Sequence, residues 1–292
     1  MLKILVDSTC DLLPEEAAGY GIHIIPMYVT LGGRTYRDDG KELSREEFYR
    51  RLRTERELPR TSQPSIGDFE QAFRELTADG SELLCLTISS RLSGTWQAAK
   101  AAAESLPAGR IHVVDTQAVS VSLSLLAIKA AEMAAAGAPA AEIIPVLESI
   151  VRNYRIVFVV ETLEYLHKGG RIGTASAFLG TLLDIKPLLT IKDGIVQPLH
   201  KVRTKKAAKA RMLEIFEAGI APGTTIASAI AHTASHEEAQ WLADELRSRY
   251  NCRRLYISEM GPVVGTHGGP GLIGAAIYPI EAEQAPAQSP HQ

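Results

Sequence analysis

The sequence predicts an α/β fold with two domains: an N-terminal parallel sheet flanked by helices, and a second α/β domain that contains antiparallel strands. Short runs rich in β-branched residues alternate with amphipathic segments, as in a parallel sheet covered by helices. Hydrophobic residues make up 46% of the chain and aromatic residues only 6%, so aliphatic side chains fill the expected core. An Asp-Gly pair between two β-rich runs in the second half indicates a hairpin.

The first half contains the expected parallel sheet. Its predicted strands cover residues 3–6, 22–25, 83–88 and 111–114. Helices between them begin at capping boxes, in which a hydroxyl and an acid three residues later exchange hydrogen bonds with backbone amides. Ser44 with Glu47 is one such box, and Ser65 with the shorter Asp68 is a weaker one. The apolar stretch 118–136 is interrupted by serines, a lysine and a glutamate, so we expect a buried helix there rather than a membrane span.

The second half begins after a helix that we expect to run from Pro139 to about Asn153. Its predicted strands cover residues 156–160, 188–191, 195–200 and 224–231. Asp193-Gly194 separates the two middle strands, and a third capping box, Ser235 with Glu238, begins the next helix.

These patterns divide the chain into three parts. We expect an N-terminal α/β domain over residues 1–155 and a C-terminal α/β domain over residues 156–280. Residues 281–292 have too few apolar side chains to offset the entropy of ordering and are expected to be a disordered tail.

The composition excludes several classes of function. A net charge of −3 gives no electrostatic reason to expect a nucleic-acid partner. The cysteines at 10, 85 and 252 form no C-x-x-C pair, which favours a reducing compartment and argues against a zinc ribbon. The apolar run before Asp7 is too short for a signal peptide. We therefore expect a cytoplasmic protein.

Two patterns resemble cofactor sites but are not expected to be functional. His232 and His236 straddle the end of a strand and the start of a helix, and the glutamate of H-E-x-x-H is missing. Residues 269–274 match the dinucleotide fingerprint, but the chain beyond them is too short for the helix, strand and acid that this fold requires. We therefore predict neither a metal nor a nucleotide cofactor.

A glycine-rich turn carries the most informative cation of the sequence. Gly169 and Gly170 allow backbone conformations that are closed to other residues, so Arg171 is expected to project from the surface. A guanidinium placed in this way suits a phosphate or an acidic partner. The basic run 201–211 has two interpretations, a solvated helix face or a docking face for an acidic partner.

Hydroxyl-rich loops indicate where a ligand would bind. Ser93-Gly94-Thr95 follows a strand and precedes a helix, which places it at the edge of the sheet where α/β proteins bind ligands. Free amides and the helix dipole favour an anion there. The alternative is that Ser93 only caps the helix. Thr61 and Ser62 have the same two interpretations, because they also precede a helix start.

His267 lies among glycines with little bulk to bury it, so it is either available to a ligand or simply solvated. Together with the loops above it belongs to a set of five segments that resembles the DegV family of bacterial fatty-acid-binding proteins from about residue 3 to residue 279. In the order of the family, these segments are 6–12, 61–65, 89–95, 163–187 and 261–271.

The resemblance implies a carrier protein rather than an enzyme. A long-chain fatty acid would lie between the two domains as the only ligand, without a cofactor. Its carboxylate would contact the loop of Ser93, Gly94 and Thr95 and one of Thr61 or Ser62, with His267 beside it. Arg171 would belong to the surface used by a separate fatty-acid kinase, which forms an acyl-phosphate for phospholipid synthesis.

Two other functions remain open from the sequence. One is a serine-dependent hydrolase or acyltransferase with Ser93 as nucleophile and His267 as base, although no G-x-S-x-G elbow is present. The other is a sugar- or triose-binding module related to dihydroxyacetone kinases, which would have a small polar pocket.

Overall fold

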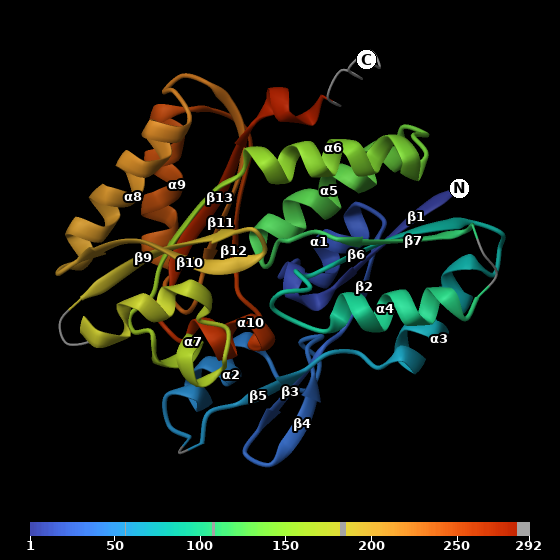
Figure 1. The fold of residues 1–292 in the computed structure, drawn as a ribbon, viewed down its shortest axis with the longest axis horizontal. Coiled ribbons are helices and arrows are strands. Elements are labelled where there is room, and N and C mark those ends of the chain that lie inside the picture. The colour runs from blue at the N-terminus through green and yellow to red at the C-terminus, as the bar shows by residue number, and fades with distance from the viewer. Residues whose placement is uncertain (56, 107–108, 182–184, 285–292) are drawn as a thin grey trace.

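The computed structural model describes residues 1–55, 57–106, 109–181 and 185–284, and its elements form three sheets (Figure 1). The first sheet is fully parallel, as expected. In spatial order its strands are β2 (Ile22–Ile25), β1 (Leu2–Asp7), β6 (Glu82–Thr87) and β7 (Ile111–Asp115). Each of them matches a predicted strand within one or two residues.

Helices cover both faces of this parallel sheet because its strands are apolar on both sides. Leu5 of β1 packs against α3 (Ile66–Thr77) and α4 (Thr95–Glu104). Ile4 and Val6 point the other way and join the core that contains α5 (Val121–Ala135). Because the side chains of a strand alternate between its faces, neighbouring residues of β1 serve two different layers. The short helix α1 (Pro14–Gly19) lies beside β2.

The second sheet is mixed, and all six of its strands follow residue 154. In spatial order they are β10 (Ile195–Val202), β9 (Lys186–Lys192), β8 (Arg155–Val159), β13 (Ile273–Pro279), β11 (Thr225–His232) and β12 (Asn251–Glu259). β11 and β12 are parallel, and the other neighbours are antiparallel. The predicted hairpin is confirmed, since β9 and β10 meet at Asp193-Gly194.

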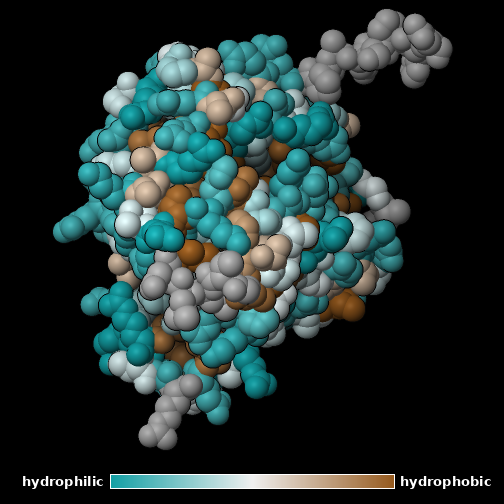
Figure 2. All heavy atoms as spheres, turned by 60° about the vertical axis from the view of Figure 1, so that its left-hand side comes forward, coloured by the Kyte–Doolittle hydropathy of each residue, from teal (hydrophilic) through white to brown (hydrophobic). Residues whose placement is uncertain are grey.

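Helices α8 (Lys205–Gly219) and α9 (His236–Arg249) cover the outer face of the mixed sheet, on the left of Figure 1. The inner face packs toward α5 and α6 (Ala140–Asn153), so that the largest core cluster contains residues from both large sheets. The surface seen in Figure 2 is mostly hydrophilic, with hydrophobic side chains in small patches. The predicted domain boundary near residue 155 coincides with the start of β8 and stays a prediction.

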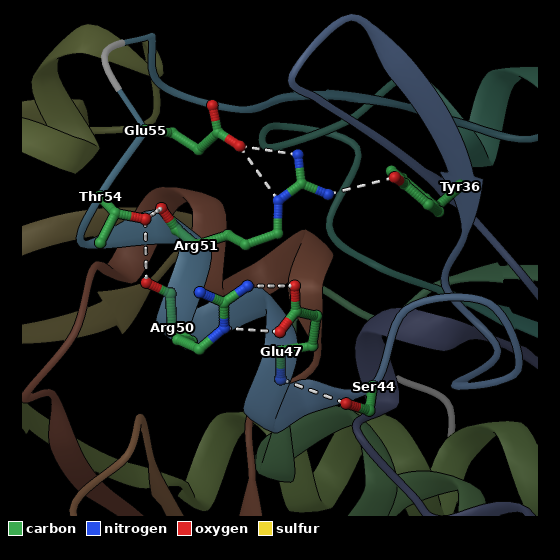
Figure 3. A network of polar contacts seen from close by, with 7 residues as sticks. All are labelled: Tyr36, Ser44, Glu47, Arg50, Arg51, Thr54 and Glu55. Atoms are coloured by element: carbon green, nitrogen blue, oxygen red, sulfur yellow. Dashed lines mark hydrogen bonds and ion pairs between the residues drawn. The ribbon is translucent and has the colours of Figure 1, made fainter.

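A third, small sheet was not predicted. It contains β4 (Arg34–Arg37), β3 (Tyr28–Leu31) and β5 (Arg60–Ser62), all antiparallel, and it packs with α2 (Arg45–Leu52). A polar network joins the helix to the hairpin (Figure 3). Arg51 binds Glu55 at 2.7 Å through Nη2 and donates to the Tyr36 hydroxyl at 3.1 Å through Nη1. This network stabilises the small sheet to which β5 belongs.

All three predicted capping boxes differ in detail from expectation. Ser44 accepts from Glu47 N, but the Glu47 carboxylate binds Arg50 and does not return the bond that would complete the box.

The two later boxes differ in opposite ways. Ser65 and Asp68 form a complete capping box rather than a weak one. Ser235 precedes α9 but makes no capping hydrogen bond with its side chain, so the third capping box was wrong. Its hydroxyl instead donates to the Thr233 carbonyl, and Glu238 pairs with Lys205 at 2.8 Å.

The first residues of the expected disordered tail are ordered, which corrects the prediction for them. Ile280–Glu283 form a 3-10 helix with Ala282 buried, and Glu283 pairs with Lys129 at 2.7 Å. This ion pair and the buried methyl group hold the segment against α5. The remainder of the predicted tail, residues 285–292, lies outside the described residues.

Candidate functional site

An apolar cavity lies where the inner face of the mixed sheet meets α5 and the loops that follow the parallel strands. It holds about 890 Å³ of space free of protein atoms, part of it open to solvent. Its apolar lining comes from the mixed sheet, from α5 and from the loops and short helices around them, and includes Ile88, Val119, Val121, Ile156, Phe158, Leu166, Ile191, Val196, Met260, Val263 and Leu272.

Small residues on the inner face of the sheet leave the room for this cavity. Ala231 of β11 and Ala276 of β13 line it and belong to the core shared with α5. Their neighbours Ile230 and Ile277 point to the opposite face and pack beneath α8 and α9. At Gly274 a Cβ atom would collide with Phe158 on the adjacent strand. Because side chains alternate between the two faces of a strand, the large residues lie on the outer face of the sheet and the small ones on the inner face, where they leave space for the cavity.

Four polar side chains of the cavity lining lie near one another, and we call this group the polar end of the cavity. Thr61 comes from β5, Ser93 from the loop after β6, Arg171 from the turn after α7 (Glu164–Lys168), and His267 from α10 (Pro262–Gly268). All four are residues predicted from the sequence, and the fold brings them together from segments up to 206 positions apart. Thr61 Oγ1 and His267 Nε2 are 2.9 Å apart.

His267 is held more tightly than the sequence suggested. It lies in a helix rather than a loop, half-buried, and its ring packs on Gly169, where a Cβ atom would collide with Nδ1. Burial, and then the charge of Arg171, lowers the pKa of His267 to about 4, so the imidazole is neutral near pH 7. Within the part of the chain that the structure describes, Nδ1 has no hydrogen-bond partner.

The neutral ring makes one tautomer more favourable. A buried N–H without a partner is rarer in proteins than an unpaired acceptor. A proton on Nε2 leaves Nδ1 as an unpaired acceptor and lets the ring donate to Thr61 Oγ1. The Thr61 hydroxyl is then free to donate its own proton into the cavity.

Arg171 does not project from the surface, which corrects the sequence prediction. It is half-buried, lines the cavity, and donates from Nε to the Leu92 carbonyl at 3.0 Å and from Nη1 to the Gly169 carbonyl at 2.8 Å. Gly170 does have the expected left-handed backbone, with φ of +70°. Gly169 has an ordinary helical φ, and the contact with His267 is what requires a glycine there.

Ser93 does not cap α4, so that interpretation was wrong. The capping position is Gly94, without a side-chain hydrogen bond, and the Ser93 hydroxyl lies 2.8 Å from the Thr95 hydroxyl. Thr95 is fully buried and, like Gly94, is outside the described cavity lining. Ser62 is exposed and also outside that lining, whereas Thr61 before it on β5 lines the cavity.

A charged cluster behind α10 combines two buried aspartates with two half-buried residues that were not predicted. Asp7 and Asp11 lie in the segment 6–12, one of the five that carry the family resemblance. The structure shows that Asp7 accepts from Ile88 N at 2.6 Å and Asp11 from Gly261 N at 2.8 Å. Asp38 and Arg45 complete the cluster, and no sequence motif marks them. Arg45 donates to the Asp11 carbonyl at 3.0 Å, and Ser8 donates to Asp38 at 2.8 Å.

This cluster makes stability depend on pH. Burial raises the pKa of Asp38 to about 7, above that of an unfolded aspartate at about 3.9. The folded state therefore binds the proton more tightly, and the free energy of unfolding falls as the pH rises from about 4 to about 7. The side chain of the Asp38→Asn variant cannot ionise. We therefore expect the stability of the variant relative to the parent protein to be higher at pH 8 than at pH 5.

Urea unfolding of both proteins at the two pH values measures this difference. Asp39→Asn, which changes the next residue of the same loop, is the control and should show a smaller pH-dependent gain. A stability difference between Asp38→Asn and the parent that is the same at both pH values would contradict the prediction.

Two other features of the sequence were considered as ligand sites, the histidine pair at 232 and 236 and the basic run 201–211. His232 ends β11 and His236 begins α9, with ring centroids 5.7 Å apart, so the two straddle a boundary as predicted. Among the described residues, no group of three or more His, Cys, Asp or Glu side chains is arranged to hold a metal ion. In the basic run, Lys209 lies over the Trp241 ring at 3.9 Å and Lys205 bridges Glu161 and Glu238.

None of the described helices combines the length and apolar character needed to cross a membrane.

The fold and the site together define a class: an α/β protein in which an apolar cavity between a parallel and a mixed sheet ends at a small polar cluster. The family model described as "Uncharacterised protein, DegV family" matches residues 1–280. The chain belongs to the DegV family, as the resemblance of its five segments indicated.

Relatives and solved structures agree with this assignment. A DegV domain-containing protein from Deinococcus radiodurans is 37% identical, with 96% of this chain and 99% of the relative aligned. A structure described as fatty acid binding of a DegV family protein from Thermus thermophilus matches with a TM-score of 0.90 and 36% identity, over 95% of this chain and 99% of the other. A DegV lipid-binding protein from Thermotoga maritima matches with a TM-score of 0.87 and 34% identity, over 96% and 98%.

Proposed function

We propose that this protein binds a long-chain fatty acid between its two large sheets, with the tail in the apolar cavity and the carboxylate at the polar end. The observation that carries the proposal is the apolar cavity that ends at Thr61, Ser93, Arg171 and His267. The similar structures from Thermus thermophilus and Thermotoga maritima, described as binding fatty acid and lipid, support it.

The energetics favour an amphiphile over a small polar ligand. Each buried methylene contributes about 0.8 kcal/mol, so the tail supplies most of the affinity. A buried carboxylate would cost several kcal/mol without partners, and each hydrogen bond to the charged group returns about 1.5–3 kcal/mol. A fixed cation at Arg171 and hydroxyls at Thr61 and Ser93 meet this requirement. The apolar lining speaks against a sugar- or triose-binding module.

Neutral His267 assists the carboxylate through Thr61. A donor at Nε2 fixes the Thr61 hydroxyl as a donor toward the ligand, whereas a charged imidazolium next to Arg171 would add repulsion between two cations. Thr61 is therefore our choice over exposed Ser62 as the carboxylate contact. Gly94 and Thr95 act by holding Ser93 in place.

We further propose that the protein presents the bound carboxylate to a separate fatty-acid kinase. The half-buried polar end leaves the head group within reach of a partner, and the sequence has no phosphate-binding G-x-x-x-x-G-K-[ST] loop of its own. Holding one carboxylate oxygen at a fixed place is the contribution a carrier can make to phosphoryl transfer. Because its guanidinium points inward, Arg171 would bind the carboxylate first and would contact the kinase only at the end of the cavity.

The contacts do not favour the hydrolase alternative. The Ser93 hydroxyl pairs with Thr95 and His267 Nε2 pairs with Thr61, so the two do not form the nucleophile and base pair that catalysis needs. A serine-directed covalent probe is the discriminating reagent, and stoichiometric labelling of Ser93 would favour a hydrolase.

The binding proposal is tested by what the purified protein contains. We expect an organic extract to yield about one long-chain fatty acid per chain by mass spectrometry, because an empty apolar cavity forfeits the contacts of its lining. Delipidated protein should regain thermal stability when palmitate is added, and glucose is the matched negative control. An extract without acyl chains, combined with no stabilisation by palmitate or oleate, would contradict the proposal.

A further inference from the structure

Ser89 is a fully buried hydroxyl that joins the loop after β6 to the turn of the β9–β10 hairpin. Its Oγ donates to the Gly194 carbonyl at 2.7 Å and accepts from Arg91 N at 3.2 Å. Gly194 has a φ of +74°, and a Cβ atom there would collide with Ser89 Oγ. The turn and the hydroxyl therefore fit each other closely.

The same residue shapes the loop that carries the polar end of the cavity. The Ser89 carbonyl accepts from Leu92 N at 2.9 Å and from Ser93 N at 3.1 Å. Leu92 in turn offers its carbonyl to Arg171 Nε at 3.0 Å. A continuous set of hydrogen bonds thus runs from Gly194 through Ser89 to Ser93 and Arg171.

We propose that Ser89 is a positioning residue for the carboxylate site. Its hydroxyl anchors the loop to the hairpin, and the anchored loop orients the Ser93 hydroxyl and the Arg171 guanidinium toward the head group. Ser89 itself is outside the described cavity lining, so its effect passes through these two residues. This inference rests on the proposed fatty-acid function and adds a residue that no ligand contact would reveal.

The experiment compares two ligands that share a tail and differ in the head group. Binding of labelled palmitate and of labelled 1-hexadecanol is measured on delipidated parent protein, Ser89→Ala and the control Ser105→Ala, whose residue follows the end of α4 and whose hydroxyl donates to Glu70. We expect Ser89→Ala to weaken palmitate binding about tenfold and hexadecanol binding less than twofold. Ser105→Ala should change neither.

Gly194→Ala tests the same bond from its other side. Because its methyl group would displace the Ser89 hydroxyl, it should show the same selective loss for palmitate. Thermal unfolding of the ligand-free variants shows whether each is folded. If one of them does not fold, the other alone tests the inference.

Equal weakening for both ligands would overturn the inference, because Ser89 would then shape the apolar cavity rather than the head-group site. Unchanged palmitate binding in a folded variant would overturn it as well. Neither result affects the proposed function. A parent protein that binds no palmitate contradicts the proposed function and, with it, this inference.

Discussion

Replacing Ala276 with leucine is expected to abolish tight binding of long-chain fatty acids. Ala276 is fully buried in β13, faces α5 and lines the cavity, so the larger side chain would occupy space proposed for the tail. If about four methylenes lose their place, the cost is about 3 kcal/mol, or a loss of affinity on the order of 100-fold. Octanoate, whose chain is shorter, should be affected much less.

The measurement is the dissociation constant of palmitate and octanoate for the parent, Ala276→Leu and a control. Ala210→Leu makes the same change at an exposed position on α8 and should leave both constants unchanged. Unchanged palmitate affinity in a folded Ala276→Leu variant would mean that the tail does not lie over β13.

Arg171→Ala is expected to weaken palmitate binding by about 10- to 100-fold. It removes a charged hydrogen-bond partner, worth about 1.5–3 kcal/mol, from the polar end of the cavity. It also removes a positive charge that lowers the pKa of His267, so that pKa should rise. Binding assays and an NMR titration of the His267 ring measure the two effects on one preparation.

Arg203→Ala is the matched control for this variant. It removes a cation from an exposed position after β10, so both palmitate binding and the titration of His267 should stay the same. If Arg171→Ala kept its palmitate and lost only phosphorylation by a cognate kinase, Arg171 would belong to the docking surface that the family resemblance implied. Such a result would reject its role at the carboxylate.

The parallel sheet could be predicted because its strands are β-rich runs in a regular alternation with helices, whereas β12 of the mixed sheet was not predicted. The third sheet was missed because β3, β4 and β5 are only three or four residues long. A signal was nevertheless present, since Gly32-Gly33 between β3 and β4 is a favoured two-residue hairpin turn. Ser235 shows the opposite error, in which a correct local motif gave way to tertiary contacts.

The candidate site could be predicted in its residues but not in its geometry. Thr61, Ser93, Arg171 and His267 stand in glycine- and hydroxyl-rich segments, and such composition is visible in the sequence. The inward direction of Arg171 depends on two carbonyls, one of them 79 positions away, and the burial of His267 depends on its contact with Gly169. Contacts of that range leave no local pattern in a sequence.

The position of β13 restricts when the cavity can exist during synthesis of the protein. This strand is the last one described in the chain, yet it lies between β8 and β11 in the middle of the mixed sheet and supplies Ala276 to the cavity. A nascent chain has neither a complete mixed sheet nor a complete cavity until residue 279 has left the ribosome. The cavity can therefore enclose a ligand only after translation of both halves, and before that the apolar inner faces are exposed to aggregation.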